Sequence, residues 1–190
     1  ILVELNGIER QMYEKIREMF VKAIDNGVSG RINSLALEGL LRLRQCCVSL
    51  NMLPRSLYSQ RDNSSTKLNK VVEFIESFLR EGHKMLVFSQ FTSALEELGR
   101  LLQEKNIRYL LMTGSTRNRH ELIDRFQHHP SDKVFLISLK TGGTGLNLTA
   151  ADRVLMIDDW WNPAVENQAF SRAHRIGQHN EVMVYRFICK

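Results

Sequence analysis

The residues of this sequence best suited to chemistry lie near its carboxyl end, in the segment QAFSRAHRIGQ (168–178). On a helix, Arg172 and Arg175 would lie about one turn apart, with Gln168 one turn before Arg172, so these long polar side chains would share a face. A guanidinium is planar, permanently cationic and able to bind a phosphate through parallel hydrogen bonds. An arginine of this kind accelerates phosphoryl transfer about 10³–10⁵-fold. Arginine pairs also occur on solvated helix surfaces, so the pair alone leaves both interpretations open.

A glycine-rich segment, TGGTGLN (141–147), is the second candidate. Glycines leave backbone N–H groups accessible, and such groups bind phosphate; a tight turn between a strand and a helix explains the segment equally well. A dinucleotide fingerprint fits poorly because Leu148 stands where its third glycine belongs. The Gly-Lys-Thr/Ser ending of a triphosphate-binding loop occurs nowhere in the chain. The sequence therefore supplies one half of a phosphoryl-transfer site and lacks the half that holds the nucleotide.

Two pairs of adjacent residues between these segments have more than one interpretation. Asp158 and Asp159 could bind a metal, but adjacent residues at a strand end point in different directions, which favours a structural or capping role. Trp160 and Trp161 fit packing or contact with a nucleic-acid backbone equally well. The histidines and cysteines never combine at zinc-ligand spacing, so the sequence predicts no metal site.

The candidate segments need a scaffold, and the apolar pattern predicts one of the α/β class. From Lys67 onward, short runs that are apolar on both faces alternate with amphipathic helical segments, which is typical of an open parallel sheet flanked by helices. The predicted strands cover 85–88, 109–112, 134–137, 154–157 and 182–185. Ligands of such sheets gather beyond the carboxyl ends of the strands, and the polar segments 89–91, 138–145 and 158–163 all follow strands.

The first part of the chain has a different pattern. Apolar residues follow the helical period over 8–24 and again over 37–43, and a polar run then leads to Thr66. We therefore predict a helical subdomain over 1–62 and an α/β domain over 63–190. The net charge of +5 permits a nucleic-acid partner.

No apolar run approaches the roughly 20 residues of a membrane span. Cys46, Cys47 and Cys189 are too few and badly placed for a disulfide framework, which indicates a reducing compartment. We expect an intracellular protein with no membrane partner.

Several long segments, in one order, resemble the carboxyl-terminal half of Swi/Snf-type ATPases, the chromatin-remodeller-like branch of helicase superfamily two. The segments similar to motif IV, the stretch after it, motif V and motif VI are HKMLVFSQFTSALEEL (83–98), LLMTGSTRNRHELIDRF (110–126), LISLKTGGTGLNLTAADRV (136–154) and DWWNPAVENQAFSRAHRIGQ (159–178). The earlier LRLRQCC (41–47) is similar to the helical stretch that precedes this lobe. The resemblance implies a RecA-like lobe preceded by part of a helical protrusion.

The resemblance also implies a motor activity. In the family, ATP binds between two lobes, and closure of the cleft steps the enzyme along double-stranded DNA without separating its strands. The ATP and Mg²⁺ would be held mainly by an amino-terminal lobe absent from this chain. Arg172 and Arg175 would reach the γ-phosphate, Gln168 would orient their helix, and Gly143 and Gly145 would line the nucleotide. The DNA-backbone contacts would come from Ser89, Gln90, Thr113, Gly114, Lys140, Thr141 and Trp161.

The sequence departs from the family pattern at a few positions. Thr141 replaces a more usual alanine, Asp159 a proline and Ser171 an acidic residue, and none of these changes removes a phosphate ligand.

Three hypotheses follow. The first is the second lobe of a DNA-stimulated ATPase that is inactive in isolation, with double-stranded DNA, the amino-terminal lobe and protein–DNA complexes as partners. The alternative is a free-standing nucleic-acid-binding module with a degenerate helicase lobe. A third keeps the enzyme but makes RNA or single strands its substrate. The protein would act in the cytoplasm or nucleoid of a bacterium, or in the nucleus of a eukaryote.

Overall fold

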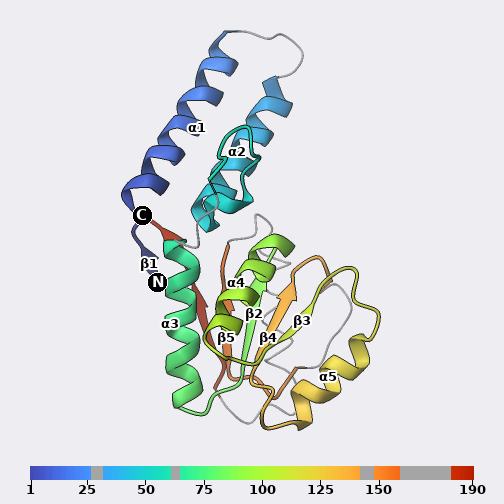
Figure 1. The fold of residues 1–190 in the computed structure, drawn as a ribbon. Helices are drawn as coiled ribbons and strands as arrows, with labels where there is room; N and C mark the ends of the chain where they lie inside the picture. Colours follow the sequence, from blue (N-terminus) through green and yellow to red (C-terminus); the bar gives the residue numbers. More distant parts are fainter. Residues whose placement is uncertain (27–31, 61–64, 142–147, 159–180) are drawn as a thin grey trace. The chain divides into compact units, whose positions relative to one another are not determined.

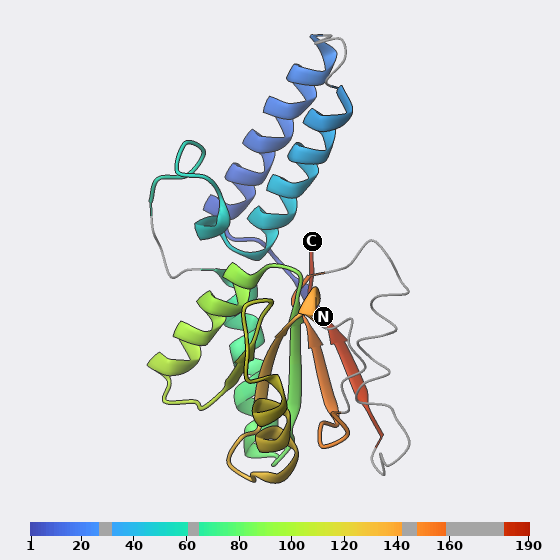
Figure 2. The same cartoon turned by 90° about the vertical axis from the view of Figure 1, so that its right-hand side faces the viewer.

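The chain folds into two compact units. The computed structural model describes residues 1–26, 32–60, 65–141, 148–158 and 181–190 (Figures 1 and 2). An α/β unit contains Ile1 and Asn69–Ile188, and a helical unit contains Leu2–Leu68 and Cys189–Lys190. The sequence predicted a division between residues 62 and 63, a few residues before the point at which these units divide. Each unit is described by itself below.

The α/β unit is built on a parallel sheet of five strands in the order β3-β4-β2-β5-β6. Its strands are β2 (Met85–Ser89), β3 (Leu110–Met112), β4 (Val134–Ser138), β5 (Arg153–Met156) and β6 (Met183–Arg186). Its helices are α3 (Thr66–Arg80), α4 (Thr92–Glu104) and α5 (Arg119–His128). The first turn of α3 belongs to the helical unit. The predicted fold class and all five predicted strands are confirmed.

Both faces of the central strands are buried. Every residue of β2 and of β4 is buried, because a parallel sheet with helical connections is covered on both sides. On one face, Phe126 of α5 packs against Phe135 of β4 with ring centroids 5.3 Å apart. The core on this face also contains alternate residues of the neighbouring strands, among them Leu86, Phe88, Leu110, Met112, Ile137, Val154 and Met156. The apolar runs of the sequence are thus the centre of the sheet.

The connections bring several loops to one edge of the sheet. From β2 the chain passes through α4 to β3, on the far side of β4, and then returns through α5 to β4 (Figure 1). The right-handed crossover rule puts α4 and α5 on opposite faces of the sheet. Because β2, β3 and β4 are parallel, the segments that follow them all begin at the same edge.

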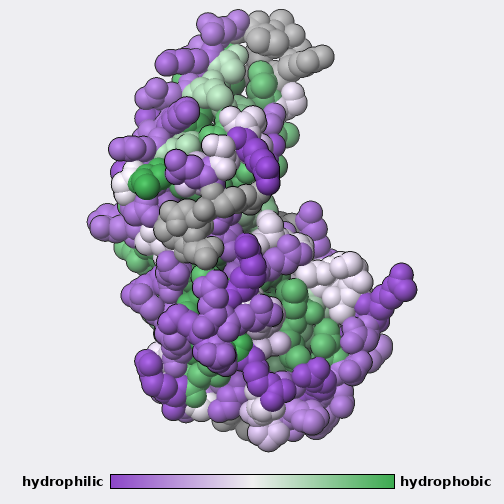
Figure 3. Space-filling model, in the orientation of Figure 1, coloured by the Kyte–Doolittle hydropathy of each residue, from purple (hydrophilic) through white to green (hydrophobic). Residues whose placement is uncertain are grey.

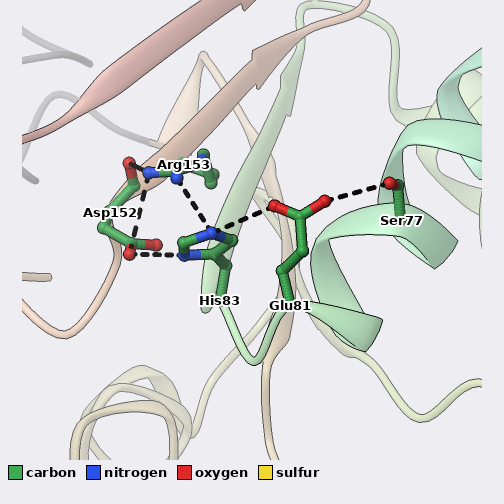
Figure 4. Close-up of polar contacts among 5 residues, drawn as sticks. All are labelled: Ser77, Glu81, His83, Asp152 and Arg153. Carbon is green, nitrogen blue, oxygen red and sulfur yellow. Dashed lines mark hydrogen bonds and ion pairs between the residues drawn. The ribbon is translucent and has the colours of Figure 1, made fainter.

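The opposite, amino-terminal edge is held by a cluster of polar side chains (Figure 4). His83 precedes β2, and its Nδ1 lies 2.7 Å from Asp152 Oδ2, just before β5. Arg153 Nη2 lies 2.9 Å from His83 Nε2, and Glu81 Oε2 lies 3.4 Å from the same nitrogen. Ser77 Oγ donates to Glu81 Oε1 at 3.1 Å. These contacts join the starts of β2 and β5 to the end of α3, which is a structural role.

The helical unit contains α1 (Gly7–Asp25), α2 (Ile32–Val48), the short 3₁₀ helix η1 (Leu50–Met52) and the strand β1 (Leu2–Val3). The strand β7 (Ile188–Cys189) contributes Cys189 to this unit and Ile188 to the α/β unit. α1 starts with a capping box, in which Asn6 Oδ1 accepts from Glu9 N–H and Glu9 Oε2 accepts from Asn6 N–H, each at 2.9 Å. The other oxygen of Glu9 accepts from Thr66 N–H at 2.9 Å. One buried carboxylate therefore ties the start of α1 to the start of α3 within this unit.

Candidate functional site

Polar residues converge at the carboxyl edge of three adjacent strands, as the sheet topology requires. Met112 of β3 pairs with Ile137 of β4, and Ser138 of β4 pairs with Ser89 of β2. Beyond the strand ends, Leu139 N–H still donates to the backbone oxygen of Ser89 at 2.9 Å. The predicted DNA-contacting residues that the structure brings to this edge are Ser89, Gln90, Thr113, Gly114, Lys140 and Thr141.

Asp158 organises the loop after β2. This carboxylate is 5% exposed and accepts from the Ser89 hydroxyl through Oδ1. Its Oδ2 accepts from Gln90 Nε2 at 2.5 Å and from Gln90 N–H at 3.3 Å. Sequence reasoning favoured a structural role for Asp158 but did not identify these partners, which lie far away along the chain. Asp158 fixes where the Ser89–Gln90 loop starts.

These contacts bear on the expected magnesium ion. Both oxygens of Asp158 accept hydrogen bonds from protein donors, and the residue is only 5% exposed. Within the described ranges, no group of three or more His, Cys, Asp or Glu side chains could hold a metal ion.

Ser89 is oriented inward. Its side chain is 0% exposed, donates to Asp158 and accepts from Phe91 N–H at 3.0 Å. A contact between this hydroxyl and DNA would require it to leave these partners. The contact of Ser89 with DNA stays a prediction. Gln90, beside Ser89, is only half-buried.

The loop after β3 is braced by its own side chains. Thr113 N–H donates to Thr116 Oγ1 at 2.9 Å, and Arg119 donates to the carbonyl oxygens of Gly114 and Thr116 at 3.2 and 3.1 Å. A Cβ added at Gly114 would meet no described atom within 4 Å. The packing of this unit therefore does not require a glycine here, and a ligand could approach the backbone closely.

The loop after β4 combines an exposed cation with a buried hydroxyl. Lys140 is exposed, as a phosphate-binding ammonium group must be. Thr141 is 5% exposed, and its Oγ1 has no hydrogen-bond partner among the described residues. Its predicted contact with DNA stays a prediction.

The remaining predicted site residues lie outside the described residues. They are Gly143, Gly145, Trp161, Gln168, Arg172 and Arg175. Their assigned roles stay predictions.

Sequence reasoning missed a groove beside the edge strand β3. Figure 3 shows hydrophobic surface between α4 and α5, over β3. Tyr109, Leu111 and Leu122 are among the residues that line the groove. At its border Arg125 Nη2 lies 3.1 Å from Asp132 Oδ2. The lining comes from separate segments of the chain, so no single motif marks it.

None of the helices in the described ranges is long and apolar enough to span a membrane.

The parallel sheet and its polar carboxyl edge define a RecA-like helicase lobe. Residues 66–177 match the family described as "Helicase conserved C-terminal domain", and the chain belongs to that family. Within it, the chain is a Swi/Snf-type carboxyl-terminal lobe, so the resemblance found in the sequence is confirmed.

The chain is similar to an uncharacterized ATP-dependent helicase of Mycoplasma pneumoniae, with 37% identity across 100% of this chain and 18% of that protein. It thus spans about a fifth of the length of this curated relative.

Two solved structures from Sulfolobus solfataricus are also similar, each at 30% identity over 100% of this chain. One is a SWI2/SNF2 ATPase C-terminal domain, with a TM-score of 0.79 and 77% of that chain covered. The other is a SWI2/SNF2 ATPase core in complex with dsDNA, with a TM-score of 0.83 and 40% of that chain covered.

Proposed function

We propose that this chain is the second motor lobe of an ATP-dependent double-stranded DNA translocase or remodelling ATPase. The lobe supplies Arg172 and Arg175 to the γ-phosphate of ATP and its carboxyl sheet edge to the DNA backbone. The observation that carries the proposal is the convergence of Gln90, Gly114 and Lys140 on one edge of a Swi/Snf-type lobe. The protein would act inside the cell, on DNA and protein–DNA complexes.

The chemistry of this edge suits a phosphate backbone rather than bases. The Lys140 ammonium attracts a phosphate, the Gln90 amide can donate a hydrogen bond, and Gly114 allows close approach of its backbone. Phosphate contacts position a protein on DNA without reading sequence, and they release counterions. DNA binding should therefore be sensitive to salt and largely independent of sequence.

The nucleotide part of the proposal needs a second lobe. The chain has no Gly-Lys-Thr/Ser sequence, so the loop that would hold the triphosphate belongs to a preceding lobe. Arg172 and Arg175 would stabilise the charge that develops on the γ-phosphate during its transfer to water. Mg²⁺ bound with ATP would neutralise phosphate charge, and among the described residues no group of three or more His, Cys, Asp or Glu side chains could hold it. An isolated lobe would therefore be inactive.

The substitution Arg175→Ala in the full-length protein tests the proposal. We expect DNA-stimulated ATP hydrolysis to fall about 10³-fold or more, because the arginine would act on the transferring phosphate. ATP binding, measured by fluorescence of a labelled nucleotide, should persist because the other lobe holds most of the nucleotide. Near-normal turnover by this variant would refute the assignment of the arginine.

The alternative function makes a different prediction. A free-standing binding module predicts that residues 1–190 bind duplex DNA as tightly as the full-length protein does. Titration of both with the same duplex at one salt concentration separates the two functions, since the motor hypothesis requires the second lobe for full affinity.

A further inference from the structure

The edge strand β3 has a surface that the proposed motor function does not use. In the sheet of the α/β unit β3 comes first, and among the described strands it pairs with β4 alone. Backbone N–H and C=O groups of successive strand residues point to alternate sides, so part of those of β3 point away from β4. On that side β3 has no strand partner in the described part of the chain. An open row of donors and acceptors is a template for a further strand.

The groove beside β3 has an apolar wall on the face of the sheet that α4 covers (Figure 3). A Cβ added at Gly99 of α4 would lie 2.7 Å from Tyr109 Oη, and Gln103 Nε2 of α4 donates to the same hydroxyl at 3.1 Å. Leu111 shares this face with Tyr109, because side chains two residues apart in a strand point the same way. Both residues line the groove and are half-buried. The contact with α4 therefore fixes an apolar wall that remains open to the side chains of a ligand.

The wall on the α5 face is cationic. Asp132 Oδ2 accepts from Arg125 Nε of α5 at 3.1 Å, and Arg108 Nη2 lies 3.8 Å from Asp132 Oδ1. The Asp132 side chain is 4% exposed, whereas those of Arg108 and Arg125 are 68% and 38% exposed. Two accessible guanidinium groups thus accompany one buried carboxylate. This wall carries a net positive charge that attracts acidic groups.

We propose that the groove beside β3 binds an extended segment of a partner protein, in which apolar and acidic side chains alternate, and that this segment adds to the sheet as a strand. Successive side chains of a strand point to opposite faces. One set would contact Tyr109 and Leu111, and the other would reach Arg108 and Arg125. Backbone hydrogen bonds to β3 provide affinity in this mode of recognition, and the two walls provide specificity.

A single extended segment fits the groove better than a second copy of the chain does. Residues of α4 and α5 line the groove together with β3, so β3 is recessed between the two helices. In a second copy β3 would be recessed in the same way, and two recessed strands cannot reach each other. A free segment has no such flanking helices.

Selection of random linear peptides displayed on phage, with the full-length protein as the target, tests the site. We expect the enriched peptides to alternate apolar residues with aspartate or glutamate, because the two walls differ in polarity and charge. The selection does not involve ATP or DNA, so its result is independent of the proposed motor function. Enrichment of no peptide, or of basic peptides, would overturn the proposal.

Arg108→Glu and Arg80→Glu form a matched pair of variants. Arg108 lines the groove, whereas Arg80 is an exposed residue at the end of α3, a helix that packs against β6 through Phe74 and Tyr185. Fluorescence anisotropy of a selected peptide should show affinity about fivefold or more lower for Arg108→Glu, because an attraction becomes a repulsion. Arg80→Glu should bind as the wild-type protein does. Equal losses would indicate a general effect of net charge and overturn the proposal; circular dichroism establishes that both variants are folded.

The peptide backbone provides a test that side-chain contacts alone would not satisfy. In an added strand, alternate peptide amides point toward β3 and the others point away. N-methylation of one alternate set should weaken binding about tenfold or more, and N-methylation of the other set should have little effect. Hydrogen exchange of the β3 amides in the full-length protein should slow when the unmodified peptide binds.

Three outcomes of these measurements would contradict strand addition. Equal losses from both methylated peptides, or no protection of β3, would show that the peptide binds in another conformation or at another place. Self-association of the full-length protein that blocks the selected peptide would assign this edge to a second copy of the chain.

Discussion

Asp158 connects two parts of the carboxyl edge that are far apart in sequence. Its carboxylate accepts from Ser89 and twice from Gln90, and it does so almost entirely out of water. A buried donor that loses its acceptor costs the free energy of its own desolvation. Three donors of the Ser89–Gln90 loop therefore share one acceptor group, the Asp158 carboxylate.

The substitution Asp158→Asn should destabilise the protein. The amide places an N–H₂ group where a carboxylate oxygen accepts, which leaves a buried donor of Ser89 or Gln90 unpaired and costs about 1–3 kcal/mol of unfolding free energy. Urea unfolding of the chain measures this change.

Asp124→Asn is the matched control for this experiment. The Asp124 side chain is 71% exposed and contacts the exposed His128, so the same chemical change should alter stability by at most about 0.5 kcal/mol. Equal stability of the two variants would show that Asp158 does not anchor the loop.

At the scale of secondary-structure elements, α1 and α2 approach closely at Gly39. A Cβ at this position would lie 2.7 Å from Cγ and 3.0 Å from Cβ of Phe20. The contact is with the base of the Phe20 side chain, which cannot swing away as the tip of a long side chain can. The packing of the two helices therefore depends on the absence of a side chain at residue 39.

Gly39→Ala should therefore destabilise the helical unit. Overpacking costs about 1–3 kcal/mol, which exceeds the gain of about 0.5–1 kcal/mol from replacing glycine by alanine in a helix. The midpoint of urea unfolding, followed by far-ultraviolet circular dichroism, should fall. Gly7→Ala, where a Cβ would meet no described atom within 4 Å, should leave the midpoint unchanged or raise it. A midpoint for Gly39→Ala at or above the wild-type value would contradict this account of the packing.

Strand β4 provides a test of the proposal that the carboxyl edge of the sheet binds DNA. Lys133 precedes its first residue and Lys140 follows its end, so the two lysines mark opposite edges of the sheet. Lys140→Ala in the full-length protein should weaken duplex binding and reduce the slope of log K against log salt by about 1, because one phosphate contact is lost. Lys133→Ala removes the same charge and should leave the slope unchanged. Equal effects would indicate a general effect of net charge instead of a binding edge.

At the scale of the whole molecule, the chain corresponds to only 18% of the length of its curated relative from Mycoplasma pneumoniae. That relative is more than five times as long, and this chain has no Gly-Lys-Thr/Ser sequence that would hold the triphosphate. We therefore expect coupling between DNA and ATP to require a further lobe that holds the triphosphate.

We expect hydrolysis by the full-length protein to be stimulated more by duplex DNA than by single-stranded DNA or RNA. A sheet edge that contacts successive phosphates favours the nucleic acid whose backbone geometry it matches. Steady-state ATPase assays with duplexes, single strands and RNA of equal length measure the preference. Equal or greater stimulation by RNA would favour the third hypothesis, in which RNA or single strands are the substrate.

The positions of helices and strands in the α/β unit were predictable from the sequence. Val87 and Leu136 are buried in strands whose neighbours along the chain are also apolar, and this pattern is local. The meeting of Ser89, Thr113 and Lys140 at one edge also followed, because parallel strands share the edge at which they end. The motifs of the family could also be read from the sequence, because each is a continuous segment of the chain.

Other features were decided only by tertiary structure. The sequence does not reveal that Asp158 accepts from Gln90, 68 residues earlier, or that the Cys189 thiol donates to the backbone oxygen of Cys47, 142 residues away. The sequence by itself determined the elements, their order and the family, because periodicity and motifs depend on neighbouring residues. Only the folded chain decided which polar side chains share a proton or an acceptor, because hydrogen-bond partners are set within about 3 Å by packing across the whole unit.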